Sequence, residues 1–244
     1  MEVEITKISS IIDGIRSMYM SKRSWNDELE QKLQEWDSKF ISKRGGIQYV
    51  NDPDWDEFYK TCKKLFKWGQ IHSTMLRYID ITCIVNGLHR GATDDFDSHA
   101  KRLENRIIRS STRLADYGNE KSDWYKDKIL TTDEVLEKLR VELPETIIHN
   151  NQTYVRTTNG YVLEEYKDNR DVKRGLCMLS IPMTFTFKCN ITELAHIYRE
   201  RGSKEYGAHG TAAPELQEMM ETLIDELNKY VSFITRDYLL KIVQ

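Results

Sequence analysis

The chain has 244 residues, with 36 lysines and arginines against 39 aspartates and glutamates, so its formal net charge is -3. This length favours one domain with a sizeable core, and the near-balance of charge argues against a protein that coats nucleic acid. No stretch approaches the roughly 18 apolar residues of a membrane span, no secretion signal opens the chain, and the four cysteines form no CxxC pair. We therefore expect a reduced, cytoplasmic protein that binds neither membrane nor nucleic acid and holds no metal.

The first third of the chain has the apolar spacing of helices. Residues 9–19, 25–40 and 56–68 place apolar side chains at helical intervals, and a region containing glycines and a proline separates the last two. Over residues 77–85 the composition changes to β-branched and aromatic residues, which predicts a strand. Asn86-Gly87 is expected to end that strand.

The middle of the chain returns to a helical pattern. Residues 98–116 predict a long helix, and residues 132–141 predict a short one with Thr132 as its N-cap. Residues 153–166 carry the clearest β-hairpin signal, with the turn at Thr158-Asn159-Gly160.

The last third alternates between strand and helix. Apolar and polar residues alternate over 179–189, as in a half-buried strand. Asn190 is then a good N-cap for a helix that stops at Gly202. Pro214 is a good first residue for a helix that runs to about residue 230, and residues 232–243 predict a last helix. Strands that lie far apart, with helices clustered at both ends, predict an α+β single domain over residues 1–244, whose central, mostly antiparallel sheet is flanked by helices.

A run of arginines is the first candidate site. Four arginines recur at intervals of four, three and four residues, so the predicted helix would align them along one side, with two serines beside them. The planar guanidinium suits phosphate, which makes the stripe a candidate anion site. The alternative to phosphate binding is that the arginines form a solvated helix face or contact acidic groups of another subunit or segment. The residues are Arg102, Arg106, Arg109 and Arg113, with Ser110 and Ser111.

Other chemistry has weaker support from the residues alone. The chain has no GxGxxG, GxxxxGK[ST], HExxH or GxSxG motif, so any dinucleotide would be held outside a Rossmann fold. Cys177 enters a strand, where a cysteine is more often inert packing than a nucleophile. His196, alone on a helix, is more often a structural or solvated histidine than a functional one. On local evidence His72, just before a strand, belongs to a turn that ends a helix.

Taken together, these segments resemble the flavin-dependent thymidylate synthase family (ThyX). Residues 174–201 reproduce the family's order of an arginine, a strand, an asparagine that opens a helix and a final arginine, and residues 212–217 resemble its His-Ala-Gln-x-Glu-Ile tail. His72-Ser73-Thr74 precedes a strand as the family's histidine does. The family's Arg-His-Arg signature falls at Glu104-Asn105-Arg106, where only the last arginine is kept. The resemblance covers about residues 9–235, with the hairpin near 150–167 as an insertion.

The resemblance implies an enzyme of nucleotide biosynthesis. The family binds FAD between the subunits of a homotetramer, takes hydride from NADPH, and transfers a one-carbon unit from 5,10-methylenetetrahydrofolate to C5 of dUMP. Carried over, it places Arg174 and Arg201 on the nucleotide, where they polarise the base, and Asn190 and His196 on the flavin, with His72 and Tyr78 nearby. A variant that acts on dCMP or makes a hydroxymethyl product fits equally.

The eroded Arg-His-Arg signature keeps two other classes of protein open. One is a homologue that binds nucleotide through its arginines but has lost catalysis. The other is a helix-rich adaptor that uses its charged faces to bind a protein partner. The arginine stripe supports phosphate binding independently of the resemblance, whereas the flavin rests on the resemblance alone.

Overall fold

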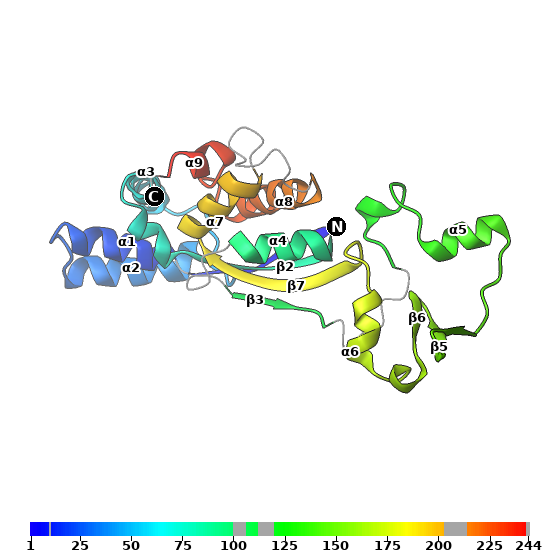
Figure 1. Cartoon of the computed structure of the whole chain (residues 1–244). Helices are drawn as coiled ribbons and strands as arrows, with labels where there is room; N and C mark the ends of the chain where they lie inside the picture. Colours follow the sequence, from blue (N-terminus) through cyan, green and yellow to red (C-terminus); the bar gives the residue numbers. More distant parts are fainter. Residues whose placement is uncertain (10, 100–105, 112–119, 203–213, 243–244) are drawn as a thin grey trace.

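The body of the molecule is built on a four-stranded antiparallel sheet. In spatial order its strands are β1 (Glu2–Ile8), β2 (Asp80–His89), β7 (Pro182–Asn190) and β3 (Arg106–Arg109) (Figure 1). The predicted α+β class with an antiparallel sheet flanked by helices is confirmed. The computed structural model describes residues 1–9, 11–99, 106–111, 120–202 and 214–242.

One face of this sheet carries the core. Along β7 the side chains of Met183, Phe185, Phe187 and Cys189 are buried and those between them are exposed, as the alternation of the sequence predicts. The covered face packs against α4 (Arg90–His99), α7 (Ile191–Ile197) and α8 (Pro214–Tyr230), which lie together on one side of the sheet in Figure 1.

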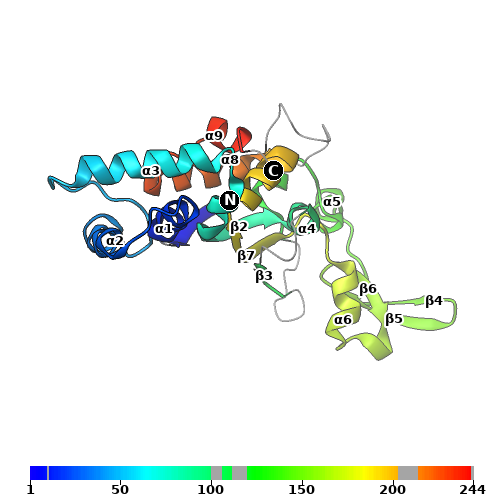
Figure 2. The same cartoon turned by 90° about the vertical axis from the view of Figure 1, so that its left-hand side faces the viewer.

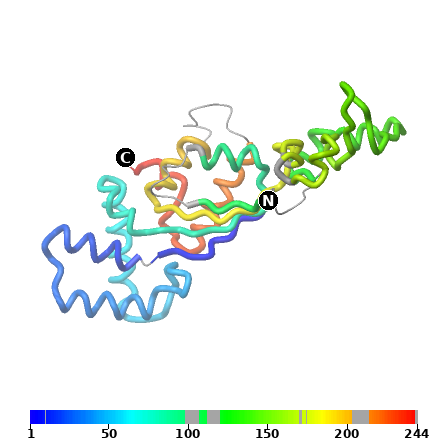
Figure 3. Tube along the Cα trace, turned by 60° about the horizontal axis from the view of Figure 1, so that its bottom comes forward, coloured from blue at the N-terminus to red at the C-terminus, as the bar shows by residue number. Residues whose placement is uncertain are grey.

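The predicted N-terminal helices are confirmed as α1 (Ile11–Ser21), α2 (Asp27–Phe40) and α3 (Trp55–Gly69). They pack beside one end of the sheet (Figure 3). At the C-terminal end, the predicted helix over 232–243 is only the short α9 (Arg236–Leu240). Shorter turns connect the main elements: η1 (Ser73–Tyr78), η2 (Asp123–Tyr125), η3 (Glu164–Tyr166), η4 (Arg174–Leu176) and the π-helical η5 (Tyr198–Gly202).

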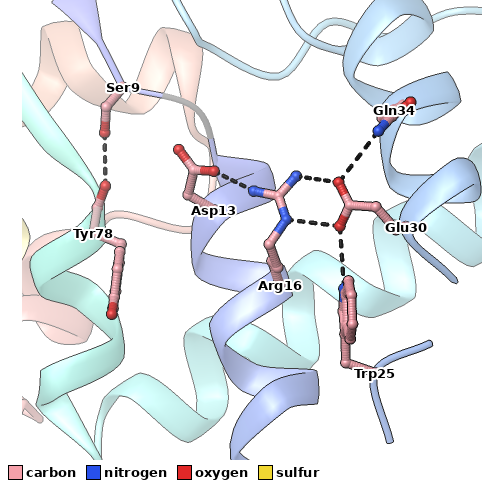
Figure 4. A network of polar contacts seen from close by, with 7 residues as sticks. All are labelled: Ser9, Asp13, Arg16, Trp25, Glu30, Gln34 and Tyr78. Carbon is pink, nitrogen blue, oxygen red and sulfur yellow. Dashed lines mark hydrogen bonds and ion pairs between the residues drawn. The ribbon is translucent and has the colours of Figure 1, made fainter. Parts of the chain in front are cut away.

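An ion-pair network ties α1 to α2. The guanidinium of Arg16 donates two hydrogen bonds to the carboxylate of Glu30, at 2.8 and 2.7 Å, and contacts Asp13 (Figure 4). The indole of Trp25 donates to the same carboxylate at 3.1 Å. These donors lower the pKa of Glu30 to about 2, with the Arg16 hydrogen bond as the largest cause.

The end predicted for the strand over residues 77–85 is wrong. β2 passes through Asn86-Gly87 and ends at His89, and its register with β7 shifts between Asn86 and Leu88. Gly87 has a φ of +90°, which glycine adopts without a steric penalty, so the residue accommodates a β-bulge instead of ending the strand. β1, which has no counterpart among the predicted elements, pairs with the other edge of β2.

The predicted helix over 98–116 is also wrong. α4 ends at His99 and the chain re-emerges as β3, which pairs with β7. The side chain of Ile107 packs against the core while Ile108 is 75% exposed, the two-residue alternation of a strand. Arg106 and Arg109 are three residues apart, so a strand does not align them on one face. Arg102 and Arg113 lie outside the described residues.

Residues 120–178, called the arm below, project away from the body (Figures 1 and 2). The predicted hairpin is confirmed as β5 (Gln152–Thr157) and β6 (Gly160–Leu163), and β4 (Thr146–His149) adds a third strand. The arm also holds α5 (Thr132–Leu139) and α6 (Arg170–Lys173). The N-cap of α5 is Thr131, not the predicted Thr132, because Thr131 forms a reciprocal capping box with Glu134.

Candidate nucleotide site

A buried arginine lies where α7 continues into η5. Arg201 is only 6% exposed, and its Nη2 lies 3.2 Å from Oδ1 of Asp95 on α4. Its Nε is buried and has no hydrogen-bond partner among the residues that the structure describes. An arginine stays protonated in proteins, and a buried N–H without an acceptor is costly. The side chain is therefore arranged for a further acceptor.

The local sequence holds this arginine in place. The side-chain oxygen of Asn190 accepts the backbone N–H of Glu193 at 2.9 Å and so caps α7, as predicted. At the other end, a Cβ added to Gly202 would lie 2.8 Å from Cβ of Met220, so a glycine is required where η5 meets α8. Both ends of the segment that carries Arg201 are thus fixed against the body.

Aspartates of α4 meet the arginines from other elements. Arg109, on β3, contacts Asp94, and its Nη2 lies 3.6 Å from Asp97. Arg201 pairs with Asp95, which lies between Asp94 and Asp97 in the sequence. Arg109 therefore does not belong to a helical stripe of unpaired cations; acidic groups of a neighbouring helix face it.

The two serines of the stripe follow β3. Ser110 donates its backbone N–H to the Thr184 carbonyl at 2.8 Å, and its Oγ accepts the Thr184 N–H at 3.2 Å. It therefore extends the pairing with β7. Ser111 follows it and is partly buried. Arg106 stands opposite Lys188 in the β3–β7 register, and Arg174 begins η4 at the end of the arm; the side chains of both arginines lie outside the described part of the structure.

The segments predicted to meet the flavin lie side by side. Oγ1 of Thr192, in α7, donates to the carbonyl of Ser73 at 3.0 Å, and the N–H of Ile191 donates to that of Ile79 at 3.1 Å. The start of α7 is therefore joined to η1 and the residue after it. His72 precedes η1, and Tyr78 ends it.

The four predicted flavin neighbours differ in exposure. His72 is exposed beside Trp68, Tyr78 is 53% exposed, and His196 is partly exposed. Asn190 is only 5% exposed, because it caps α7. The carbonyl of Tyr78 accepts the Ser9 hydroxyl at 2.8 Å (Figure 4), which fixes the end of η1.

Sequence reasoning missed a buried histidine–glutamate pair. His89, at the end of β2, and Glu215, in the first turn of α8, are 6% and 2% exposed. Nδ1 of His89 contacts the Glu215 carboxylate, which also accepts the His89 backbone N–H at 3.2 Å. Tyr125 packs edge-on against the imidazole with 4.9 Å between ring centroids. One signal was present: Glu215 falls four residues before the buried Met219, on the apolar face of its helix.

No helix among the described residues has the length and apolar character needed to cross a membrane. The same residues contain no group of three or more His, Cys, Asp or Glu side chains placed to hold a metal ion.

Comparison with known proteins identifies the fold. No protein-family model matches the chain, and neither does any curated protein sequence. A ThyX structure from Helicobacter pylori, complexed with FAD and dUMP, is 17% identical with a TM-score of 0.57, and the match covers 97% of this chain and 99% of that one. The UMP/dUMP methylase PolB from Streptomyces cacaoi, bound with 5-Br UMP, is 10% identical with a TM-score of 0.53, covering 100% and 96%. The chain therefore has a ThyX-like fold, as the resemblance implies.

Proposed function

We propose that this chain is a flavin-dependent enzyme that transfers a one-carbon unit from 5,10-methylenetetrahydrofolate to C5 of a pyrimidine deoxynucleotide, dUMP or dCMP. The observation that carries the proposal is Arg201, a buried cation whose Nε has no acceptor among the described residues, inside a ThyX-like fold. Solved structures of that fold are described with dUMP or with brominated uridine nucleotides. The proposal includes a homotetramer, which the resemblance implies, and a cytoplasmic location, which the scattered cysteines favour.

Arg201 has the chemistry to bind and polarise such a nucleotide. Its planar guanidinium donates in two directions, so Asp95 can hold one edge while Nε donates to a phosphate or carbonyl oxygen. A donor fixed before the substrate arrives stabilises negative charge that develops on the base, and this makes C5 more nucleophilic. Arg174 is proposed as the second arginine of the clamp.

The residues at the junction of η1 and α7 fit a flavin in part. His72, Tyr78 and His196 have exposed or partly exposed side chains that can contact the cofactor. The Asn190 oxygen already accepts an N–H of α7, so Asn190 is a positioning residue that sets the start of the helix. FAD, when bound, supplies the redox chemistry, with NADPH as the reductant, while the protein orients the reactants.

The first test is the visible absorption spectrum of the purified protein, before and after incubation with excess FAD and desalting. We expect a retained flavin band that shifts when dUMP or dCMP is added, and NADPH oxidation by the reconstituted protein. A folded protein that cannot retain FAD would refute the flavoenzyme.

Arg201→Ala tests the nucleotide clamp by calorimetry with dUMP. A hydrogen bond to a charged group contributes about 1.5–3 kcal/mol, so we expect affinity to fall by about 10- to 150-fold. The matched control is Arg199→Ala, two residues earlier. Its Nη2 donates to the Leu240 carbonyl at 2.8 Å, so this change is expected to affect stability and leave dUMP affinity unchanged. Equal affinities of the wild type and Arg201→Ala would contradict the clamp.

A homologue that binds nucleotide without catalysis is the second candidate. It is favoured by the pairing of Arg109 and Arg201 with α4 aspartates, because these ion pairs stabilise the fold without a ligand. Glu104-Asn105, in place of the family's Arg-His, favours it as well. Binding of dUMP that depends on Arg201, in a protein that retains no FAD, would identify this function.

A further inference from the structure

A row of lysines lies on the exposed face of α3. Four lysines recur along its last three turns, at intervals of three, one and three residues, and all four are exposed. In Figure 2, α3 lies lengthwise along the outside of the molecule, next to α1. In the described part of the chain, the only side chain of α3 in an ion pair is that of Glu57, which meets Lys32 at 2.6 Å. The lysines are Lys60, Lys63, Lys64 and Lys67.

The row leads along the helix to the proposed flavin site. Lys60, Lys64 and Trp68 are spaced by four residues, so they follow one another along α3. The Nζ of Lys22, which follows α1, lies 3.4 Å from the centroid of the Trp68 ring. One turn further, the N–H of His72 donates to the Trp68 carbonyl at 2.8 Å, and the two rings pack edge-on. The positive charge therefore ends beside His72, an exposed residue that is proposed to contact the flavin.

We propose that these four lysines and Lys22, called the lysine row below, bind the glutamate end of folate and the further glutamates that extend it through γ-linked amides. The inference rests on the function proposed above, because it assigns a surface to the carbon donor of that reaction. The pterin ring carries the one-carbon unit, so it enters the site and the glutamate end remains outside. That end holds the carboxylates of the molecule, and a γ-linked chain adds one carboxylate with each glutamate.

The cations of the lysine row repel one another. Like charges three or four residues apart destabilise a helix, and α3 has lysine pairs at both intervals. Burial and the charge of Lys64 lower the pKa of Lys22, with burial as the larger cause. Lys67 lies in the last turn of α3, where a cation is favourable for the helix dipole, but this does not explain the lysines of the preceding turns. Carboxylates bound along the row would relieve the repulsion.

Aromatic rings hold two of the ammonium groups in place. Lys22 lies over Trp68, and the Nζ of Lys63 lies 4.6 Å from the centroid of the Tyr59 ring. Such cation–π contacts restrict the side chains and leave the outer side of each ammonium group open to an anion. Part of the row is therefore ordered before a ligand binds, which lowers the entropic cost of binding.

The row suits a short chain of carboxylates better than a nucleic acid. It contains only lysines, whereas arginine is the usual residue for phosphate recognition. Lys22 already covers the indole of Trp68, on which a base could otherwise stack. The net charge of the chain is -3, so the surface outside the row repels a long polyanion. From Lys60 to Trp68 the helix rises about 12 Å, which limits the ligand to a few carboxylates.

A fluorescent penta-γ-glutamate is the direct probe, because its binding needs neither flavin nor nucleotide. Anisotropy titrations of the whole protein should show saturable binding that weakens as salt is raised from about 50 to 300 mM, since exposed charges are screened. A single-stranded oligonucleotide of equal charge is the comparison probe. Absence of penta-γ-glutamate binding, or equal or tighter binding of the oligonucleotide, would overturn the proposal.

Variants then place the probe on the lysine row. Lys60→Gln combined with Lys64→Gln removes two charges and keeps good helix formers. Exposed ion pairs contribute little each, so we expect penta-γ-glutamate binding to weaken about 2- to 30-fold. Lys43→Gln combined with Lys167→Gln, at two exposed lysines outside the row, changes the net charge equally and should leave binding nearly unchanged. Equal weakening in both double variants would refute the site.

Two folates test whether the row serves the carbon donor. By calorimetry, pteroylpentaglutamate should bind the wild type more tightly than pteroylmonoglutamate, and the difference should shrink in Lys60→Gln with Lys64→Gln. Equal affinities of the two folates for the wild type would overturn the assignment to folate. The two proposals fail separately: a protein that cannot retain FAD refutes the flavoenzyme, whereas the penta-γ-glutamate and folate measurements decide the lysine row.

Discussion

The buried pair of His89 and Glu215 gives the strongest prediction about stability. The Glu215 carboxylate contacts both Nδ1 and the backbone N–H of His89, so Glu215→Ala removes the acceptor of two buried groups. Among the described contacts, α8 offers these groups no other acceptor. Each unsatisfied buried donor costs about 1–3 kcal/mol, so the two together cost about 2–6 kcal/mol. For a chain of this size, that corresponds to a fall in Tm of about 4–24 °C.

A double-mutant cycle checks this magnitude by urea and thermal denaturation. Replacing both residues, in His89→Leu with Glu215→Leu, removes the imidazole and the carboxylate together and leaves only the backbone N–H of residue 89 without this acceptor, so it should recover part of the loss. Glu218→Ala, an exposed position one turn further along α8, is the control and should change stability by no more than about 0.5 kcal/mol. If the single changes are additive, or Glu215→Ala costs less than about 1 kcal/mol, the pair does not hold α8 to β2.

Three further predictions concern the stability of the fold and the reactivity of its thiols. Because Arg16 lowers the folded pKa of Glu30 from 4.5 to about 2, the ion pair stabilises the fold fully above the unfolded pKa and loses its effect as pH falls from about 4.5 to 2. Urea titrations from pH 6 to pH 2 should therefore show a shallower acid loss for Glu30→Gln than for the wild type, and parallel curves would contradict this. Burial raises the pKa of three of the four thiols while Cys177 is partly exposed, so a thiol reagent should modify one cysteine rapidly in the native protein and four after unfolding. Asn190→Ala should destabilise the fold by about 1 kcal/mol and Asn190→Asp by much less, since aspartate also caps; equal losses would show that the cap contributes little.

Elements with a strong local pattern were predictable from the sequence. Alternation along β7 gave both the strand and its buried face, and the cap at Asn190 gave the start of α7. β1 and β4 were missed. Each is an edge strand that is stabilised by pairing with a later strand. In β1 a two-residue alternation of apolar and polar residues over residues 2–5 was available as a signal.

The error at residues 98–116 has a physical cause. Intervals of four, three and four between arginines match a helix, and local spacing alone favours that structure. In the fold, the free edge of β7 offers hydrogen bonds to residues 106–109, and Ile107 gains a place in the core. Tertiary pairing outweighs this helical periodicity.

The candidate site was predictable only in part for a related reason. The resemblance pointed to Arg201, but no sequence pattern could supply its partner Asp95, which is more than a hundred residues away on another element. The same separation hides the contact between His89 and Glu215, 126 residues apart. Contacts of this kind are set by how α4, α8 and the sheet pack, which local propensity does not encode.

The aspartates of α4 also determine how an anion would meet the two arginines. Asp94 and Asp97 both face Arg109. In the described part of the chain, Arg201 pairs with Asp95 and its Nε has no acceptor. A phosphate near Arg201 is repelled by the carboxylate of Asp95, so Asp95→Asn should tighten dUMP binding while lowering stability, because it removes the partner of a buried cation. Asp97→Asn leaves Arg109 paired with Asp94 and should change dUMP affinity little. If both substitutions tighten dUMP binding equally, general electrostatics governs affinity, and Arg201 is not the specific contact.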